Sequence, residues 1–288
     1  MQTMTGPLSF KALESLVAPL LALCEEAGAA ICEHYHAPDA DHYEAKGDDS
    51  PLTRADLASD AILALGLKQL APQLPILSEE SAHIDVDERL GWPRYWLVDP
   101  LDGTKEFLAR TGEFTINLAL VDNHRPVLGV LFLPLTRLAY VGIPGSRAWR
   151  RDMASGEDVA LTTRPLTTER PLAVLASRRH KGRRLLACLD WLGERWPRLE
   201  RHNSGSALKF CQLAEGAGDF YPRFSRCCEW DTAAGHAVLE AAGGTLLGMD
   251  GMPLRYNLTE SVYSPDFYGF GDPGHTLWRE LLAAGDFR

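Results

Sequence analysis

Two aspartates, Asp99 and Asp102, stand three positions apart in the stretch WLVDPLDGTKEF. They follow an apolar run that is typical of a buried strand, and the turn-forming pair Gly103 and Thr104 comes directly after them. Two carboxylates held together in a buried place raise the pKa of one of them or bind a cation that compensates their charge. A purely structural reading is a turn aspartate followed by a helix N-cap at Asp102, because residues 104–108 can form a short helix. The pair alone leaves both readings open.

Three further acids in comparable positions favour the cation. Glu79 ends an earlier apolar strand, Asp56 opens a predicted helix in SPLTRAD, and Asp231 opens another in WDTAAGH. If the strands that end in Glu79 and Asp99 are neighbours, their carboxylates meet at one edge of a sheet. Each acid alone has a structural alternative, such as a helix N-cap at Asp56 and Asp231. Together they offer the oxygen ligands that hard cations such as Mg²⁺ prefer.

The spacing of these acids excludes several other kinds of site. An EF-hand calcium loop that begins at Asp99 needs oxygen-bearing side chains at positions 101 and 103, where the chain has Leu101 and Gly103. Phosphatases that form an aspartyl-phosphate place the second acid two residues after the first, and here it lies three residues on. The chain also contains no GxxxxGK[ST] phosphate-binding loop and no GxSxG nucleophile motif.

Composition excludes other classes of protein. A formal net charge of -10 argues against binding to a nucleic-acid polymer, which needs a basic surface. No apolar run reaches the roughly 18 residues of a membrane span, and we see no signal peptide. The six cysteines fit no zinc-binding pattern, and Cys24, Cys188 and Cys211 lie in apolar helical contexts. We therefore predict a cytoplasmic protein with reduced, buried thiols and no integral membrane segment.

The elements that must position the acids follow from the hydrophobic pattern. Apolar residues at helical spacing predict helices over 9–36 and 54–70. We expect the strand over 94–99 to end at Pro100, and short apolar runs between 114 and 152 predict an antiparallel meander. Strands and helices alternate after about residue 165. These patterns predict an N-terminal α+β lobe, residues 1–163, with most of the acids, and a C-terminal α/β lobe, residues 164–288, with Asp231.

The blocks ILSEES, WLVDPLDGTKEF and EWDTAAGH resemble the inositol monophosphatase superfamily of Mg²⁺-dependent, lithium-sensitive phosphatases. The stretches DSPLTRAD, SRRH, GSALKF and YPRF are similar to the CysQ-type 3'(2'),5'-bisphosphate nucleotidases within it. The resemblance extends from about residue 20 to about residue 270. It implies a layered α-β-α-β-α sandwich of the inositol monophosphatase and fructose-1,6-bisphosphatase type.

The same resemblance implies roles for individual residues. Two or three Mg²⁺ ions would be held by Glu79, Asp99, the carbonyl of Leu101, Asp102 and Asp231. The attacking water would be oriented and deprotonated by Asp56 and Thr104. Substrate would be bound by the backbone of Gly103 and Thr104 and by His180, Ser206, Lys209, Arg223 and Asp231.

The C-terminal lobe is expected to select the substrate, because the metal ligands are common to the superfamily. The stretch SRRHKGRR, residues 177–184, concentrates basic side chains. A solvated helix start explains some of them, but in an acidic protein such a cluster can also dock a second phosphate. Lys209 alone could equally be a surface lysine. Three departures from the nucleotidase pattern stand out: Arg179, Ala207 and the segment SRCCE, residues 225–229, which matches no pattern of the family.

These observations predict an enzyme that removes the 3'-phosphate of adenosine 3',5'-bisphosphate to give AMP and phosphate, and that also acts on phosphoadenylyl sulfate. One alternative is an inositol monophosphatase, although a substrate with one phosphate has less need of the basic cluster. An alternative of another class is a non-catalytic sensor of nucleotide and metal, against which the intact set of acids argues. The protein is expected to be a monomer or a homodimer, in the cytoplasm or loosely associated with the inner membrane.

Overall fold

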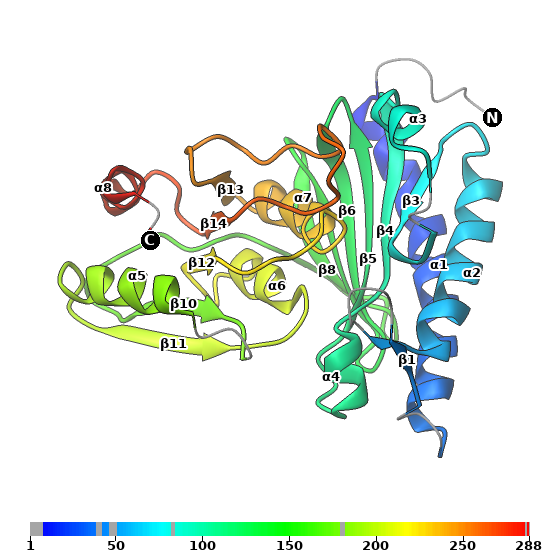
Figure 1. Cartoon of the computed structure of the whole chain (residues 1–288), viewed down its shortest axis with the longest axis horizontal. Helices are drawn as coiled ribbons and strands as arrows, with labels where there is room; N and C mark the ends of the chain where they lie inside the picture. Colours follow the sequence, from blue (N-terminus) through cyan, green and yellow to red (C-terminus); the bar gives the residue numbers. More distant parts are fainter. Residues whose placement is uncertain are drawn as a thin grey trace.

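Two large β-sheets alternate with three layers of helices in the described part of the chain, and β1 and β2 form a small third sheet (Figure 1). The computed structural model describes residues 8–38, 42–45, 51–81, 84–178, 182–285 and 287. Helices α1 and α2 cover one face of the larger sheet, α6 and α7 lie between the sheets, and α5 and α8 cover the far face of the smaller sheet. The predicted layered α+β architecture is confirmed.

The larger sheet has the strand order β3-β4-β5-β6-β7-β8-β9. Strand β3 is parallel to β4, and every later pair in the sheet is antiparallel, so the predicted meander is confirmed. Strand β5 is almost continuously buried, because helices cover both faces of the sheet. The strands are β3 (Ile76–Ser78), β4 (Arg94–Asp102), β5 (Thr115–Asp122), β6 (Arg125–Leu133), β7 (Leu138–Ile143), β8 (Arg147–Asp152) and β9 (Asp158–Ala160).

Two long helices form the outer layer of the larger sheet. Helix α1 (Phe10–His36) begins at Ser9, whose Oγ accepts a hydrogen bond from Ala12 N, and α2 (Arg54–Leu70) begins with a capping box at Thr53. By length and composition alone, helix α1 is apolar enough to cross a membrane, although its longest run without a polar or charged residue, residues 16–24, is short. Its apolar face packs against β6 and α2. The core helix of a globular protein can therefore have the length and composition of a membrane span.

The smaller sheet has the order β11-β10-β12-β14-β13 and mixes both orientations. Strand β10 is parallel to β11 and β12, whereas β14 is antiparallel to β12 and β13. Its strands are β10 (Leu172–Ala176), β11 (Leu199–Asn203), β12 (Phe220–Arg223), β13 (Thr245–Gly248) and β14 (Phe267–Phe270). Its helices are α5 (Arg183–Gly193), α6 (Leu208–Ala214), α7 (Ala233–Ala241) and α8 (Thr276–Ala284). The remaining elements are β1 (Glu44–Ala45), β2 (Pro51–Leu52), η1 (Glu79–Ser81), α3 (Val86–Leu90) and α4 (Thr104–Leu108).

Helix α7 lies unusually close to the larger sheet. A Cβ atom at Gly129 of β6 would overlap the backbone of Ala234, and one at Gly142 of β7 would overlap the backbone of Val238. These two glycines therefore let the helix approach the strands at backbone contact distance. The approach fixes the start of α7, where Asp231 lies, against the strands that follow β4.

Candidate metal and phosphate site

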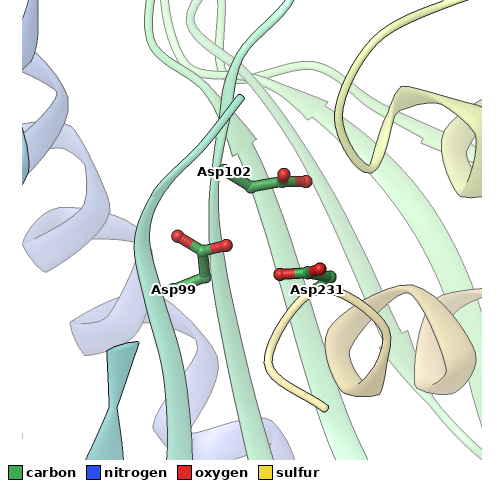
Figure 2. A group of neighbouring side chains, drawn as sticks. All are labelled: Asp99, Asp102 and Asp231. Carbon is green, nitrogen blue, oxygen red and sulfur yellow. The ribbon is translucent and has the colours of Figure 1, made fainter. Parts of the chain in front are cut away.

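The side chains of Asp99, Asp102 and Asp231 lie close together, although Asp231 is far from the other two in the sequence (Figure 2). Asp99 and Asp102 come from the end of β4, and Asp231 comes from the turn before α7. One carboxylate oxygen from each lies within 4.8 Å of the other two. Asp99 is buried, and Asp102 and Asp231 are partly exposed. The predicted convergence of these residues is therefore seen in the fold.

A bulge in β4 brings Asp99 and Asp102 to the same side. The strand continues through Pro100 to Asp102, whereas the sequence predicted an end at Pro100. Asp99 pairs with Asn117 and Asp102 with Thr115, so the register shifts between them. In a regular strand, residues three apart face opposite sides, and the extra residue of a bulge removes that alternation. Asp102 is also not the N-cap of α4, because Gly103 takes that position with φ 95°.

Neutral groups hold the three carboxylates in place. Ser206 Oγ donates to Asp102 Oδ2 at 2.7 Å, Cys228 N donates to Asp231 Oδ2 at 2.8 Å, and Leu101 N donates to Asp99 Oδ1 at 3.1 Å. Within the described residues, none of the three carboxylates forms an ion pair. The negative charges are thus oriented by hydrogen bonds. Lys209 lowers the pKa of Asp102 and Arg223 lowers that of Asp231, but neither side chain forms an ion pair with the cluster among the described residues.

The pKa values of the three aspartates reflect this crowding. Burial and the neighbouring Glu79 and Asp102 raise the pKa of Asp99 well above its ordinary range. Burial also raises the pKa of Asp102, and burial with the charges of Asp102 and Glu79 raises the pKa of Asp231 to about 8. The cluster cannot ionise fully at neutral pH without added positive charge. Its donors are all oxygens, so the chemistry fits hard divalent cations such as Mg²⁺.

Glu79 and Leu101 lie beside this cluster. Glu79 opens η1 directly after β3, and β3 is the parallel neighbour of β4, so the expectation that these strand ends meet is confirmed. Glu79, Leu101 and the three aspartates all line one cavity of about 360 Å³. The predicted metal-ligating residues are therefore brought to a single pocket.

Asp56 and Thr104, the two residues expected to orient and deprotonate the attacking water, are hydrogen-bonded to each other. Thr104 Oγ1 donates to Asp56 Oδ1 at 3.1 Å and lies 3.3 Å from the carbonyl oxygen of Leu101. The other oxygen of Asp56 accepts from Thr53 N at 2.8 Å and from Thr53 Oγ1 at 2.6 Å. Asp56 is hence the N3 residue of the capping box of α2 and not its N-cap, which is Thr53. Both its oxygens are engaged, which fixes the direction in which it holds the hydroxyl of Thr104.

The predicted substrate-binding residues of the C-terminal half line an adjoining cavity of about 300 Å³. Ser206, Lys209, Arg223 and Asp231 are all part of its wall. Ser206 has a left-handed backbone with φ 49°, which turns its Oγ toward Asp102 and to within 2.7 Å of Thr115 Oγ1. His180 lies outside the described residues.

Lys209 is buried, so its interpretation as a surface lysine is wrong. Helix α6 lies between the two sheets, and Nζ donates to the carbonyl oxygens of Ser206 at 2.6 Å and Ser204 at 3.1 Å. Burial and the nearby Arg223 lower its pKa to about 8. Arg223 is similarly occupied, because its Nε donates to Ser225 O and its Nη2 to Arg226 O.

Two arginines of the basic cluster of residues 177–184 are already paired with acids. Arg178 pairs with Glu113, and Arg184 pairs with Asp266. Positions 179–181 lie outside the described residues, so their part in binding a second phosphate stays a prediction.

Sequence reasoning missed several residues of the pocket. Thr115 and Asn117 support Asp102 from β5, and the signal for them is a pair of polar residues at alternate positions of an apolar strand. Arg226, Cys227, Cys228 and Tyr263 line the cavity that holds the aspartates. For Arg226, Cys227 and Cys228, the sequence signal is that the segment SRCCE matches no pattern of the family.

Comparisons with known proteins give the family and the fold of the chain. The profile of the Inositol monophosphatase family matches residues 12–282. The 3'(2'),5'-bisphosphate nucleotidase CysQ of Shigella flexneri is 42% identical over 245 residues, which cover 85% of this chain and 95% of the relative. The crystal structure of CysQ from Bacteroides thetaiotaomicron superposes with a TM-score of 0.76 at 34% identity and covers 88% of this chain and 97% of that one.

An inositol monophosphatase from Zymomonas mobilis has the same fold, with a TM-score of 0.72 at 26% identity over 95% of this chain and 98% of that one. The resemblance expected from the sequence blocks is therefore confirmed over most of the chain. On these grounds the chain belongs to the inositol monophosphatase family.

Proposed function

We propose that the protein is a Mg²⁺-dependent phosphatase that removes the 3'-phosphate of adenosine 3',5'-bisphosphate to give AMP and phosphate. The observation that carries the proposal is the meeting of Asp99, Asp102 and Asp231 in one pocket without a cationic partner among the described residues. The substrate is suggested by relatives that are 41–42% identical and bear the name 3'(2'),5'-bisphosphate nucleotidase. Phosphoadenylyl sulfate, which shares the 3'-phosphate, is a proposed second substrate.

The metal site is proposed to hold two or three Mg²⁺ ions. Its ligands would be Glu79, Asp99, the carbonyl of Leu101, Asp102 and Asp231, all of which line the same cavity. When bound, the ions supply positive charge that polarises the phosphate and makes water more acidic. The hydrogen bonds from Ser206 to Asp102 and from Cys228 to Asp231 keep the ligands oriented.

Asp56 and Thr104 are proposed to handle the proton of the attacking water. When the hydroxyl of Thr104 donates to Asp56 Oδ1, the lone pairs of Thr104 Oγ1 are left to accept a hydrogen bond from water. A proton released from that water can then pass through Thr104 to Asp56. The bonds from Thr53 hold the carboxylate of Asp56 still during this transfer.

Substrate binding is proposed to involve the backbone of Gly103 and Thr104 together with His180, Ser206, Lys209, Arg223 and Asp231. The contacts of Lys209 assign it a positioning task, because it holds the carbonyls of Ser204 and Ser206 and so shapes the turn that presents Ser206. The proposal also keeps the protein in the cytoplasm, where reduced cysteines persist.

Phosphate release from a panel of substrates tests the proposal. The panel contains adenosine 3',5'-bisphosphate, inositol 1-phosphate and fructose 1,6-bisphosphate, each with Mg²⁺ and with EDTA. We expect the highest kcat/KM on the bisphosphate nucleotide, and no turnover in EDTA. A higher kcat/KM on inositol 1-phosphate would support an inositol monophosphatase. Nucleotide binding without phosphate release would support the non-catalytic sensor.

A further inference from the structure

Among the described residues, the guanidinium group of Arg226 has no hydrogen-bonding partner at the wall of the acidic pocket. Arg226 is exposed and lines the cavity of about 360 Å³ together with Asp99, Asp231 and Tyr263. Its Cζ lies 3.6 Å from the centroid of the Tyr263 ring. In the part of the chain that the structure describes, the Arg226 side chain forms no hydrogen bond or ion pair. Its N–H groups are thus available to a ligand that enters the pocket.

The loop that carries Arg226 is firmly anchored. Glu229 N donates to Val262 O at 2.8 Å, Ser264 N donates to Cys227 O at 2.9 Å, and Cys228 forms an antiparallel bridge with Tyr263. Arg223 supports the loop from the other side by donating to the carbonyls of Ser225 and Arg226. Because these contacts order both the loop and the stacking partner, little entropy remains to be lost when Arg226 binds an anion.

Among the described residues, the other cations that line the two cavities, Lys105 included, already have partners. Lys209 donates to two carbonyl oxygens, and Arg223 donates to two more. Either of them would have to weaken these bonds to bind a phosphate. Arg226 would exchange only water, and stacking on a ring leaves the in-plane N–H groups of a guanidinium open. That fork of donors matches two oxygens of one phosphate group.

We propose that Arg226, seated on Tyr263, binds the phosphate of the substrate that is not hydrolysed. The residue thereby determines specificity for substrates with two phosphates over those with one. The inference rests on the proposed function, because only such a substrate carries a phosphate away from the reacting centre. It also gives a task to SRCCE, the one segment of the site that matched no family pattern.

Steady-state kinetics on two substrates test this role. Wild type, Arg226→Gln, Arg226→Lys and Tyr263→Leu are compared on adenosine 3',5'-bisphosphate and on adenosine 3'-monophosphate, with Mg²⁺. We expect Arg226→Gln to raise KM for the bisphosphate by about 10- to 100-fold, the effect of losing charge-assisted hydrogen bonds. The kcat on both substrates and KM for the monophosphate should stay within about twofold of wild type. Arg226→Lys and Tyr263→Leu should raise KM for the bisphosphate by smaller factors.

Arg195 provides a matched control. Its guanidinium also stacks on an aromatic ring, that of Trp191 of α5 in the outer layer, and Arg195 itself lies just after the end of that helix. Arg195→Gln removes the same charge and the same kind of stack, and we expect unchanged kinetics. Thermal unfolding of each variant shows whether the fold is retained.

The outcomes separate this inference from the function on which it rests. If wild type hydrolyses the bisphosphate and Arg226→Gln leaves KM unchanged, the inference alone is overturned. An equal rise of KM on both substrates also overturns it, because Arg226 would then serve the hydrolysed phosphate. A wild-type protein that releases no phosphate from the bisphosphate overturns the proposed function, and this inference with it.

Discussion

Replacing Asp231 by Asn should stabilise the protein when no metal is bound. The raised pKa of Asp231, about 8 compared with 3.8, means that its ionised form is disfavoured in the fold. Asn has the same shape without the charge, and its oxygen can still accept the hydrogen bond from Cys228 N. The substitution therefore removes repulsion against Asp102 and Glu79 while keeping the local contacts.

The raised pKa of Asp231 sets the size of the effect. A tenfold change in proton affinity corresponds to about 1.4 kcal/mol, so the destabilisation that builds up between about pH 4 and pH 7 amounts to at most about 4 kcal/mol. Because Asp99 and Asp102 share the repulsion, we expect metal-free Asp231→Asn to gain about 2 to 4 kcal/mol at pH 7. A group whose pKa is raised by folding contributes stability below its unfolded pKa and loses it as the pH rises through the folded value. The advantage of the variant should consequently grow from pH 5 to pH 8.

Urea unfolding followed by circular dichroism measures the effect. Both proteins are freed of metal with EDTA and unfolded at pH 5, 6, 7 and 8, and then again with saturating Mg²⁺. Added Mg²⁺ should stabilise wild type far more than Asp231→Asn, because the variant has lost one proposed ligand. The difference in the free energy of unfolding between Asp231→Asn and wild type should therefore become smaller, or change sign, when Mg²⁺ is present.

Asp219 supplies a control of opposite sign. Burial alone would raise its pKa, but hydrogen bonds from Arg164, Arg170 and Ala173 N lower it instead. Asp219→Asn should lose stability at pH 7, and the loss should stay nearly constant between pH 8 and pH 5 and shrink only as the pH falls below the unfolded pKa toward the lower folded value. If metal-free Asp231→Asn is no more stable than wild type at pH 8, or if its advantage does not shrink toward pH 5, the account of repelling carboxylates is refuted.

Three other substitutions probe the pocket. Asp99→Asn should reduce phosphate release to less than a tenth of the wild-type rate, about 1.4 kcal/mol in barrier, with a native circular dichroism spectrum; retention of more than a tenth would contradict its proposed role. Gly103→Ala forces a side chain into a backbone with φ 95° and 3.0 Å from the carbonyl of Glu113. It should cost about 1 to 3 kcal/mol in urea unfolding, and unchanged stability would show that the turn relaxes freely. Thr104→Val should lower kcat by about 100-fold or more while Mg²⁺ affinity by calorimetry changes little, and weak Mg²⁺ binding would instead make Thr104 a metal-site residue.

The sequence allowed prediction of those parts of the fold that depend on local pattern. The helical spacing of apolar residues predicted α1 and α2, and the short apolar runs predicted the meander. The acids were found because each stands at the end of a strand or the start of a helix. Since β3 and β4 are neighbours, that rule was sufficient to bring Glu79 toward Asp99.

Features that depend on pairing or on distant contacts could not be predicted. The bulge between Asp99 and Asp102 is a property of the pairing between β4 and β5. The sequence of β4 alone therefore predicted that the strand ends too early. Strand β11, LERHN, lies at the edge of its sheet and lacks the apolar alternation of an inner strand. The burial of Lys209 follows from the position of α6 between two sheets, which no window around that residue reveals.

Asp56 takes part both in the first turn of helix α2 and in the proposed catalytic pair, so fraying of this helix end should lower the rate of the reaction. One of its oxygens closes the first turn of α2, and the other holds Thr104. Helix ends open more readily on warming than helix interiors, so Asp56 should swing away while the rest of the molecule is still folded. Turnover is therefore expected to fade several degrees before the bulk melting transition. Thr53 does not line the pocket, but a substitution there should still lower kcat, because it removes a hydrogen bond that holds Asp56.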